Sequence, residues 1–225
     1  MIIVHENLEK EALEIADAFR RVYGLSSRIT SEDLGSLFKP IPAFNGFWTS
    51  HGEIEEFMRN KYGEKRVMVV TPRDIYGGNK NQDDDWWIGY VVGNLTGVSN
   101  ARLKCPDNRV SSVLEVPEDL YLKRLKTVAV HELAHQAICG PHHKQASWVN
   151  ARTGYEVKLG SHCTDNRCGF YEFIDIKTPP SEEGYLLLGD ERKFDAGLDD
   201  IISRLHQTWL CEQCLAHMNI DDSFL

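Results

Sequence analysis

The chain carries the octapeptide VAVHELAH at residues 128–135, and this stretch decides how the rest of the sequence is interpreted. The segment from Pro117 to Val130 repeats apolar residues every three or four positions, which predicts a helix that continues into the octapeptide. His131 and His135 are four residues apart, so on a helix their imidazoles lie on one face. The spacing predicts a helix that presents two neutral imidazoles to a single zinc ion.

Glu132 follows the first of these histidines, where a His-Glu-x-x-His motif places its general base. Zinc polarises a carbonyl and lowers the pKa of a water molecule to about 7, and Glu132 can accept the proton of that water. The alternative is a polar helix with two surface histidines, but Val128 to Val130 are apolar and predict a buried segment. We therefore expect a metal-dependent hydrolase and, among hydrolases, a metallopeptidase.

A catalytic zinc ion usually keeps three protein ligands and one open position, so a third ligand is needed. His142 and His143 follow the motif closely, whereas His162 lies further along the chain, directly before a cysteine. Proximity in sequence favours the first pair, and the cysteine pattern favours His162. A carboxylate, Glu156 or Glu172, is a further candidate because other zinc peptidases use one.

Four of the six cysteines form two close pairs. Cys163 and Cys168 are separated by four residues, and Cys211 and Cys214 form a Cys-x-x-Cys pair inside an expected helical stretch from Ile201 to His217. Four thiolates are what a tetrahedral structural zinc requires. A redox-active Cys-x-x-Cys is expected at a strand-to-helix turn, so the spacing favours a structural zinc over a redox site.

The composition is that of an ordinary globular chain, with 225 residues, 42% hydrophobic and 26% charged. A formal net charge of −9 argues against a nucleic-acid partner. The sequence has no stretch of membrane-spanning length and no signal-peptide pattern after Met1. We expect a monomeric cytoplasmic protein that acts on a peptide or protein substrate and binds neither nucleic acid nor membranes.

Strands and helices alternate along the chain, which predicts an α/β (α+β) layout. The strand expected at Val67–Val70 is a short apolar run, as is typical of a buried strand. The other expected elements are strands at Ile2–Val4, Trp87–Val92 and Gly97–Leu103, helices at Glu9–Tyr23 and Gly52–Lys61, and a loop at Phe38–Phe47.

The order of these motifs resembles that of the archaemetzincins, a small branch of the metzincin zinc metallopeptidases. The shared order is His-Glu-x-x-His, then His-Cys followed after four residues by Cys, then Cys-x-x-Cys. Upstream, Arg66 to Tyr76 is similar to a family strand that ends in Asp-Leu-Tyr. Ile88 to Leu103 is similar to a glycine-bearing strand followed by a Ser-x-x-Arg-Leu edge strand. The resemblance covers, in order, most of the chain from Val67 onward.

The resemblance implies a metzincin-like fold, with a small twisted mixed sheet, flanking helices and an active-site helix followed by a smaller C-terminal lobe. A single domain would span residues 1–225, with the sheet lobe at 1–137 and the cysteine site within the lobe at 138–225. An extended peptide substrate could pair with an edge strand of the sheet through its backbone. The residues implied for that edge are Ser99, Asn100, Ala101 and Arg102.

The resemblance also implies two zinc ions per chain. The catalytic ion would be bound by His131, His135 and His162, with Glu132 as the general base. The residues implied for the structural ion are Cys163, Cys168, Cys211 and Cys214.

The chain departs from the family pattern in ways that mark it as a divergent member with insertions. Ile138 stands at the position of a family glycine and Pro141 at the position of the third histidine. Some 21 extra residues lie within Gln136–Ser161, and Phe170 replaces a methionine that lies under the metal. The departures motivate a second hypothesis, a catalytically silent zinc-binding protein with a binding or regulatory role. The sequence leaves open the substrate and the choice between endopeptidase and aminopeptidase action.

Overall fold

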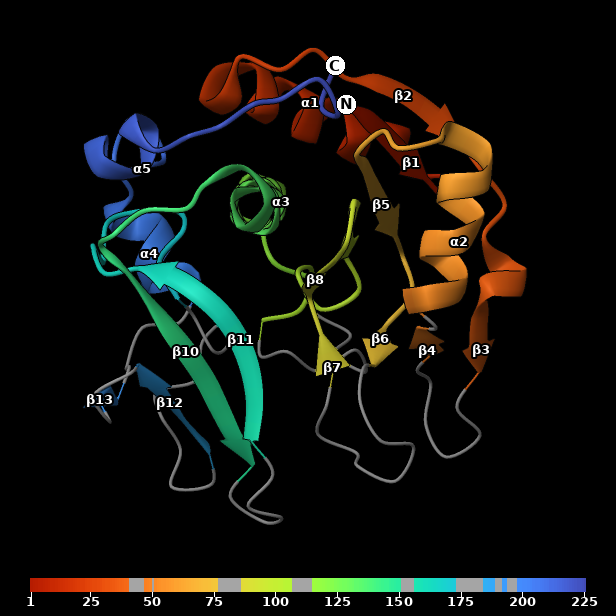
Figure 1. Cartoon of the computed structure of the whole chain (residues 1–225). Helices are drawn as coiled ribbons and strands as arrows, with labels where there is room; N and C mark the ends of the chain where they lie inside the picture. Colours follow the sequence, from red (N-terminus) through yellow and green to blue (C-terminus); the bar gives the residue numbers. More distant parts are fainter. Residues whose placement is uncertain are drawn as a thin grey trace.

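The computed structural model describes residues 1–40, 47–49, 51–76, 86–106, 115–150, 156–172, 184–188, 192–193 and 198–225. These residues form a mixed α/β fold with small sheets and flanking helices, which confirms the predicted fold class (Figure 1). In this part of the chain, no helix combines the length and the apolar character that crossing a membrane requires.

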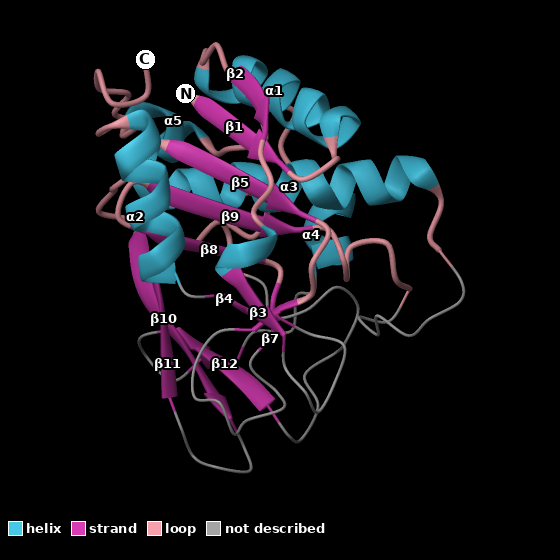
Figure 2. Cartoon of the chain, turned by 90° about the vertical axis from the view of Figure 1, so that its right-hand side faces the viewer, coloured by secondary structure: helices cyan, strands magenta, loops and turns pink. Residues whose placement is uncertain are grey.

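The central sheet has five strands in the order β2-β1-β5-β9-β8 (Figure 2). In that order the strands span Arg28–Ser31, Ile2–His5, Val67–Thr71, Leu95–Ser99 and Gly89–Val92. The first four run parallel, and β8 is antiparallel to its neighbour β9. Every residue of β5 and β9 is buried, so these strands form the middle of the sheet, whereas β8 is the last strand at one edge.

Helices cover both faces of this sheet. Successive residues of a strand point to opposite faces, so neighbouring residues pack against different helices. Ile3 belongs to a hydrophobic cluster with α1 (Glu9–Tyr23) and α3 (Glu118–Ala137). Val4, the next residue, belongs to a second cluster with α2 (His51–Tyr62). The predicted first strand, the first two helices and the buried strand β5 are each confirmed to within one residue at either end.

The long helix α3 carries the His-Glu-x-x-His motif in its last turns, as predicted. Its Arg124 is fully buried and anchors two other segments. Nη1 donates to the carbonyl oxygens of Leu103, at 3.0 Å, and Cys105, at 2.8 Å. Nε and Nη2 each donate over 2.8 Å to the carboxylate of Asp199 in α4 (Leu198–Arg204). The residues just before the motif are also fully buried, so the apolar entry to the motif lies in the core, as predicted.

After α3 the chain forms an antiparallel hairpin of β10 (His143–Asn150) and β11 (Glu156–Cys163). β12 (Gly184–Leu188) pairs with β10, and β13 (Arg192–Lys193) pairs with β12. Most of Gln136–Ser161, the segment in which the resemblance predicts extra residues, belongs to this hairpin. Figure 1 shows that it runs away from α3 and that β11 returns toward it.

The C-terminal segment has two short helices where one helical stretch, Ile201 to His217, was predicted. α4 ends at Arg204, and α5 spans Glu212–Ala216. The helices are separate because Cys211 caps α5, and its Sγ accepts a hydrogen bond from the backbone N–H of Cys214. The hydrophobic cluster around α3 also includes C-terminal residues, so the core continues across the predicted lobe boundary at residues 137/138.

A third sheet has the order β3-β4-β6-β7 and the spans Phe38–Pro40, Phe47–Thr49, Ile75–Tyr76 and Trp86–Trp87. The prediction of a loop at Phe38–Phe47 is therefore wrong at both of its ends, and residues 41–46 lie outside the described part. Pairing with distant strands, which local composition does not reveal, makes these segments extended.

Two predicted strands have different limits in the structure. The strand predicted at Trp87–Val92 is divided between two sheets, because Trp87 ends β7 and β8 begins at Gly89. The strand predicted at Gly97–Leu103 begins earlier, at Leu95, and ends at Ser99. The residues after Ser99 form turns, in which the N–H of Leu103 donates to the carbonyl of Asn100 over 3.1 Å.

Candidate functional site

Three imidazoles converge at the C-terminal end of α3. His131 and His135 lie one turn apart on that helix, and His162 comes from the end of β11. One nitrogen of each ring lies within 4.8 Å of the others, and the Nε2 atoms of His131 and His162 are 3.2 Å apart. Two nitrogen ligands of a tetrahedral zinc ion, each about 2.0–2.1 Å from the metal, are separated by about 3.3 Å. The arrangement of the three rings therefore fits one zinc ion.

Burial keeps these imidazoles neutral. Desolvation lowers the pKa of His131 to about 4 and that of His135 to about 3, and it lowers the pKa of His162 well below its usual value. Neutral imidazole is the form that binds metal ions. The Nδ1 atom of His131 lies 3.1 Å from the carbonyl oxygen of Gly169. This carbonyl accepts the Nδ1 proton, so Nε2 carries the lone pair that can bind a metal ion.

Phe170 forms an apolar floor beneath the three rings. Its side chain is almost fully buried, and its ring centroid lies 5.5 Å from that of His131, 4.9 Å from that of His135 and 5.6 Å from that of His162. Its carbonyl oxygen accepts a hydrogen bond from the N–H of Cys163 over 3.1 Å, which joins this segment to the end of β11. An aromatic ring thus stands where the archaemetzincin pattern has a methionine.

Glu132 lies beside the edge strand of the central sheet. Its carboxyl group packs against Gly89 in β8, so closely that a Cβ atom at position 89 would overlap it. A glycine is required there for this close approach. Burial raises the pKa of Glu132 to about 8, which places its ionisation near neutral pH, where a general base is most efficient.

β8 presents part of its backbone at the edge of the sheet. The N–H of Ser99 donates to the carbonyl of Ile88 over 2.9 Å, so these two residues form a hydrogen-bonded pair. Bonded and non-bonded pairs alternate in an antiparallel ladder, so Gly89 and Val91 point their N–H and C=O groups away from β9. On that side the sheet has no further strand among the described residues. Gly89, whose backbone groups point outward from the sheet, therefore contacts Glu132.

The edge predicted at Ser99–Arg102 is not found at these residues. β9 lies between β5 and β8, and Ser99 and Asn100 are only 1% and 3% exposed. Arg102 lies beyond the strand, and its Nε donates to Asp74 over 2.7 Å. The prediction is wrong because the position of a strand within a sheet depends on its pairing with distant segments. The preceding strand, β8, forms the edge.

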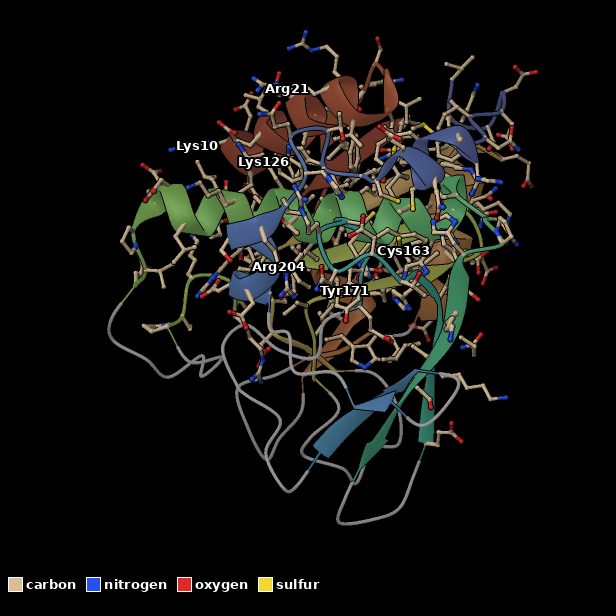
Figure 3. All side chains as sticks on the ribbon, turned by 90° about the vertical axis from the view of Figure 1, so that its left-hand side faces the viewer. Lys10, Arg21, Lys126, Cys163, Tyr171 and Arg204 are labelled. Carbon is tan, nitrogen blue, oxygen red and sulfur yellow. The ribbon has the colours of Figure 1, made fainter. Side chains whose placement is uncertain are left out.

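The four paired cysteines also come together. The Sγ atoms of Cys163 and Cys211 are 3.6 Å apart, and those of Cys168 and Cys214 are 3.7 Å apart. A tetrahedral zinc ion with zinc–sulfur bonds of about 2.3 Å separates its sulfur ligands by about 3.8 Å. Each of these two sulfur–sulfur distances is that of two ligands of one zinc ion. Figure 3 shows Cys163 near the C-terminal end of α3, where β11 ends.

Backbone N–H groups point at the sulfur atoms of this cluster. The N–H of Asp165 donates to Cys163 over 3.4 Å, and the N–H of Cys211 donates to Cys168 over 3.3 Å. Hydrogen bonds from the thiols of Cys163 and Cys214, together with the backbone N–H groups of Cys211 and Phe170, hold the pKa of Cys168 well below its usual value. Such donors stabilise a thiolate, which is the form that binds zinc.

His142, one of the two histidines that follow the motif, lies at the cysteine cluster. Its Nε2 is 3.3 Å from the Sγ of Cys214 and 3.9 Å from that of Cys211. One donor atom each from His142, Cys163, Cys211 and Cys214 lie within 4.8 Å of one another. The cluster therefore has a fifth donor, which the sequence pattern did not indicate.

His143 also faces the cysteines. Its Nδ1 accepts the N–H of Gly140 over 3.2 Å, so its proton is on Nε2 and is donated to the Sγ of Cys214 over 3.4 Å. Neither His142 nor His143 therefore joins the three imidazoles on α3 and β11. Nothing in the sequence placed these residues at the thiols, because their nearness in sequence to the motif pointed to the other cluster.

The two carboxylates considered as third ligands lie in different places. Glu156 is exposed at the start of β11, at the opposite end of that strand from His162. Glu172 is 1% exposed, and its Oε1 lies 3.6 Å from the Nδ1 of His162. The Nε2 of the same ring faces His131. Glu172 therefore lies behind His162, on the side away from the three converging nitrogens.

The fold is also that of a solved zinc peptidase. The chain resembles a zinc-dependent peptidase from Methanocorpusculum labreanum (strain Z), with a TM-score of 0.60 over 96% of this chain and 97% of that chain. The two sequences are 13% identical, so the likeness is one of fold. No protein-family model matches the chain, and no curated protein matches its sequence.

Proposed function

We propose that this chain is a zinc-dependent peptidase of the archaemetzincin type. The observation that carries the proposal is the convergence of three neutral imidazoles beside a buried glutamate at the edge of a sheet. The shared fold with the peptidase from Methanocorpusculum labreanum supports it. The motif order of the sequence, which includes a histidine directly before a cysteine, supports it independently.

The residues of the site take separate roles in the proposed reaction. His131, His135 and His162 hold the catalytic zinc, because their nitrogens are neutral and suitably spaced. When bound, zinc supplies Lewis acidity, which polarises the scissile carbonyl and acidifies the attacking water. Glu132 accepts a proton from that water and transfers it to the leaving amine. Its position in a buried pocket fits a proton acceptor with a pKa near neutrality.

We propose further that an extended peptide substrate adds to β8. The outward N–H and C=O groups of Gly89 and Val91 can pair with a peptide backbone as a neighbouring strand would. Because Gly89 touches Glu132, a peptide bound along this edge would pass the proposed general base. β8 thus takes the role of substrate-binding edge strand, which the sequence resemblance gave to residues 99–102.

Replacing Gly89 with alanine is expected to lower hydrolysis by about 10²-fold, because the added methyl group must displace the carboxyl group of Glu132. Zinc content is expected to stay at the wild-type value, since none of the metal-binding side chains changes. Val92→Ala, in the same strand but outside the outward-facing pair, is the matched control. Wild-type kcat/KM in Gly89→Ala would show that the carboxyl position is not needed for the reaction.

A structural zinc ion on Cys163, Cys168, Cys211 and Cys214 completes the proposal. The sulfur spacing and the N–H donors to the thiols support this ligand set. A zinc ion at this place would tie the end of β11 to α5. We therefore expect two zinc ions per chain by elemental analysis.

The decisive test of the proposed function is cleavage of an unbiased peptide library by the zinc-loaded protein. We expect reproducible cleavage that is lost on chelation and returns on addition of zinc. The competing hypothesis is a catalytically silent zinc-binding protein, which the inserted hairpin and the replacement of the family methionine by Phe170 motivate. A protein that holds two zinc ions and cleaves no peptide in the library would favour that hypothesis.

A further inference from the structure

A buried carboxyl group that the proposed reaction does not use lies behind one of the three imidazoles. Glu172 is 1% exposed, and neither of its carboxyl oxygens has a hydrogen-bond partner among the described residues. Burying such a group without a partner costs free energy, and a charged carboxylate costs more than a neutral polar group. We therefore expect Glu172 to have a hydrogen-bond partner once zinc is bound at the three imidazoles.

His162 is placed to be that partner. Its Nδ1 is buried, has no hydrogen-bond partner among the described residues, and lies 3.6 Å from the Oε1 of Glu172. On the opposite side of the ring, its Nε2 lies 3.2 Å from the Nε2 of His131. The imidazole thus stands between a metal position on one side and a carboxyl group on the other.

We propose that Glu172 is a positioning residue, which accepts a hydrogen bond from the Nδ1–H of His162 and so directs Nε2 toward the catalytic zinc. The proposal rests on the three-histidine zinc site of the proposed function. The carbonyl of Gly169 performs the equivalent role for His131, over 3.1 Å. A carboxylate behind a metal-bound imidazole fixes the tautomer and the ring orientation, and it makes the ligand nitrogen a stronger donor.

A second acceptor competes for the same proton. The carbonyl group of Gly160, two residues before His162 on β11, also interacts with this imidazole and raises its pKa, against the larger effect of burial. A carbonyl oxygen carries no net charge, so it strengthens the ligand nitrogen less than a carboxylate does. The two acceptors can be told apart by removing the carboxyl group, since the backbone carbonyl remains.

The test compares the zinc affinity of the wild type with that of Glu172→Leu and Glu172→Gln, measured by competition with a zinc chelator and by elemental analysis. We expect Glu172→Leu to bind zinc at the histidine site about 10–100-fold more weakly, and Glu172→Gln, which keeps an acceptor oxygen, to be affected less. The same substitutions are also made in a His135→Ala chain, which lacks the histidine site. Any zinc that this chain binds is held at the cysteine site, and its affinity there should be unchanged. The control is Glu156→Gln, which changes an exposed glutamate on the same strand as His162.

A second readout separates positioning from a general structural role. Replacing an unpaired buried carboxyl group with leucine is expected to raise the thermal stability of the metal-free protein, while the zinc affinity falls. A Glu172 with a purely structural role would change stability and leave zinc affinity at the wild-type value. If Glu172→Leu does not fold, Glu172→Ala, which also removes both acceptor oxygens, takes its place in the measurement of zinc affinity.

Wild-type zinc affinity in a folded variant that lacks any acceptor oxygen at position 172 would overturn the proposal and assign the proton of His162 to Gly160. The outcome does not depend on hydrolysis. A wild-type chain that binds zinc on its three histidines and cleaves no peptide would refute the peptidase function, and the affinity measurement would still decide the role of Glu172.

Discussion

Replacing Glu132 with glutamine is expected to lower peptide hydrolysis by about 10²–10⁴-fold while the protein keeps both of the proposed zinc ions. Glutamine has nearly the shape of glutamate but cannot accept a proton as a base. Burial already raises the pKa of Glu132 to about 8, so its pocket accommodates a neutral side chain, and the variant should fold normally. The measurement is kcat/KM on a peptide substrate, together with zinc content on the same sample.

His135→Ala provides the comparison for this experiment. It should lose hydrolysis and one zinc ion together, because it removes a ligand rather than the base. If Glu132→Gln binds two zinc ions and hydrolyses peptides at the wild-type rate, Glu132 is not the general base and the proposed reaction is wrong. The pair of variants thus separates loss of metal from loss of proton transfer.

Replacing both Cys211 and Cys214 with serine is expected to reduce the zinc content from two ions per chain to one and to lower the melting temperature strongly. The apparent free energy of structural zinc binding in small domains is on the order of 10 kcal/mol, comparable with the whole stability of a domain. A loss of about 5 kcal/mol would lower the Tm by roughly 10–20 °C in a chain of this size. Thermal denaturation of the zinc-loaded variant is the measurement.

Two single variants identify the ligands of that zinc ion. Cys168→Ser should lose the ion and His142→Ala should keep it, because the proposal assigns all four thiols and leaves the imidazole as a neighbour. The reverse result would assign the ion to His142, Cys163, Cys211 and Cys214, the second donor set whose atoms lie close together. A zinc content of one in the unmodified protein would contradict the four-cysteine site altogether.

The elements that could be predicted from the sequence are those that follow from local pattern. The helix that carries His131 and His135 was predicted because residues four apart on a helix share a face, and the buried strand at Val67 was predicted from its apolar run. β2 was missed because its four residues, Arg28–Ser31, are partly or fully exposed and show no apolar alternation. The edge strand was misplaced by one strand, because neighbours in a sheet are chosen by pairing between distant segments.

In the candidate site too, local pattern predicts some residues, and the rest depend on long-range structure. The sequence left the third imidazole open between the nearby His142 and His143 and the distant His162. In the structure, the β10–β11 hairpin brings His162 to the other two, while His142 and His143 lie at the thiols. Glu172 had no local pattern to mark it, and only its burial behind His162 suggests the role that we propose for it. These relationships depend on the path of the hairpin, which periodicity does not reveal.

The β10–β11 hairpin lowers the entropic cost of gathering three imidazoles from distant parts of the chain. His135 and His162 are separated by 26 residues. Bringing the two ends of such a segment together costs conformational entropy, and the cost grows with the length of the segment. Here the strand pairing closes that segment, and Cys163, the residue next to His162, is fixed among the other thiols. His162 is therefore confined near the other two imidazoles through its covalent neighbour, and little chain freedom remains to be lost when a ligand arrives.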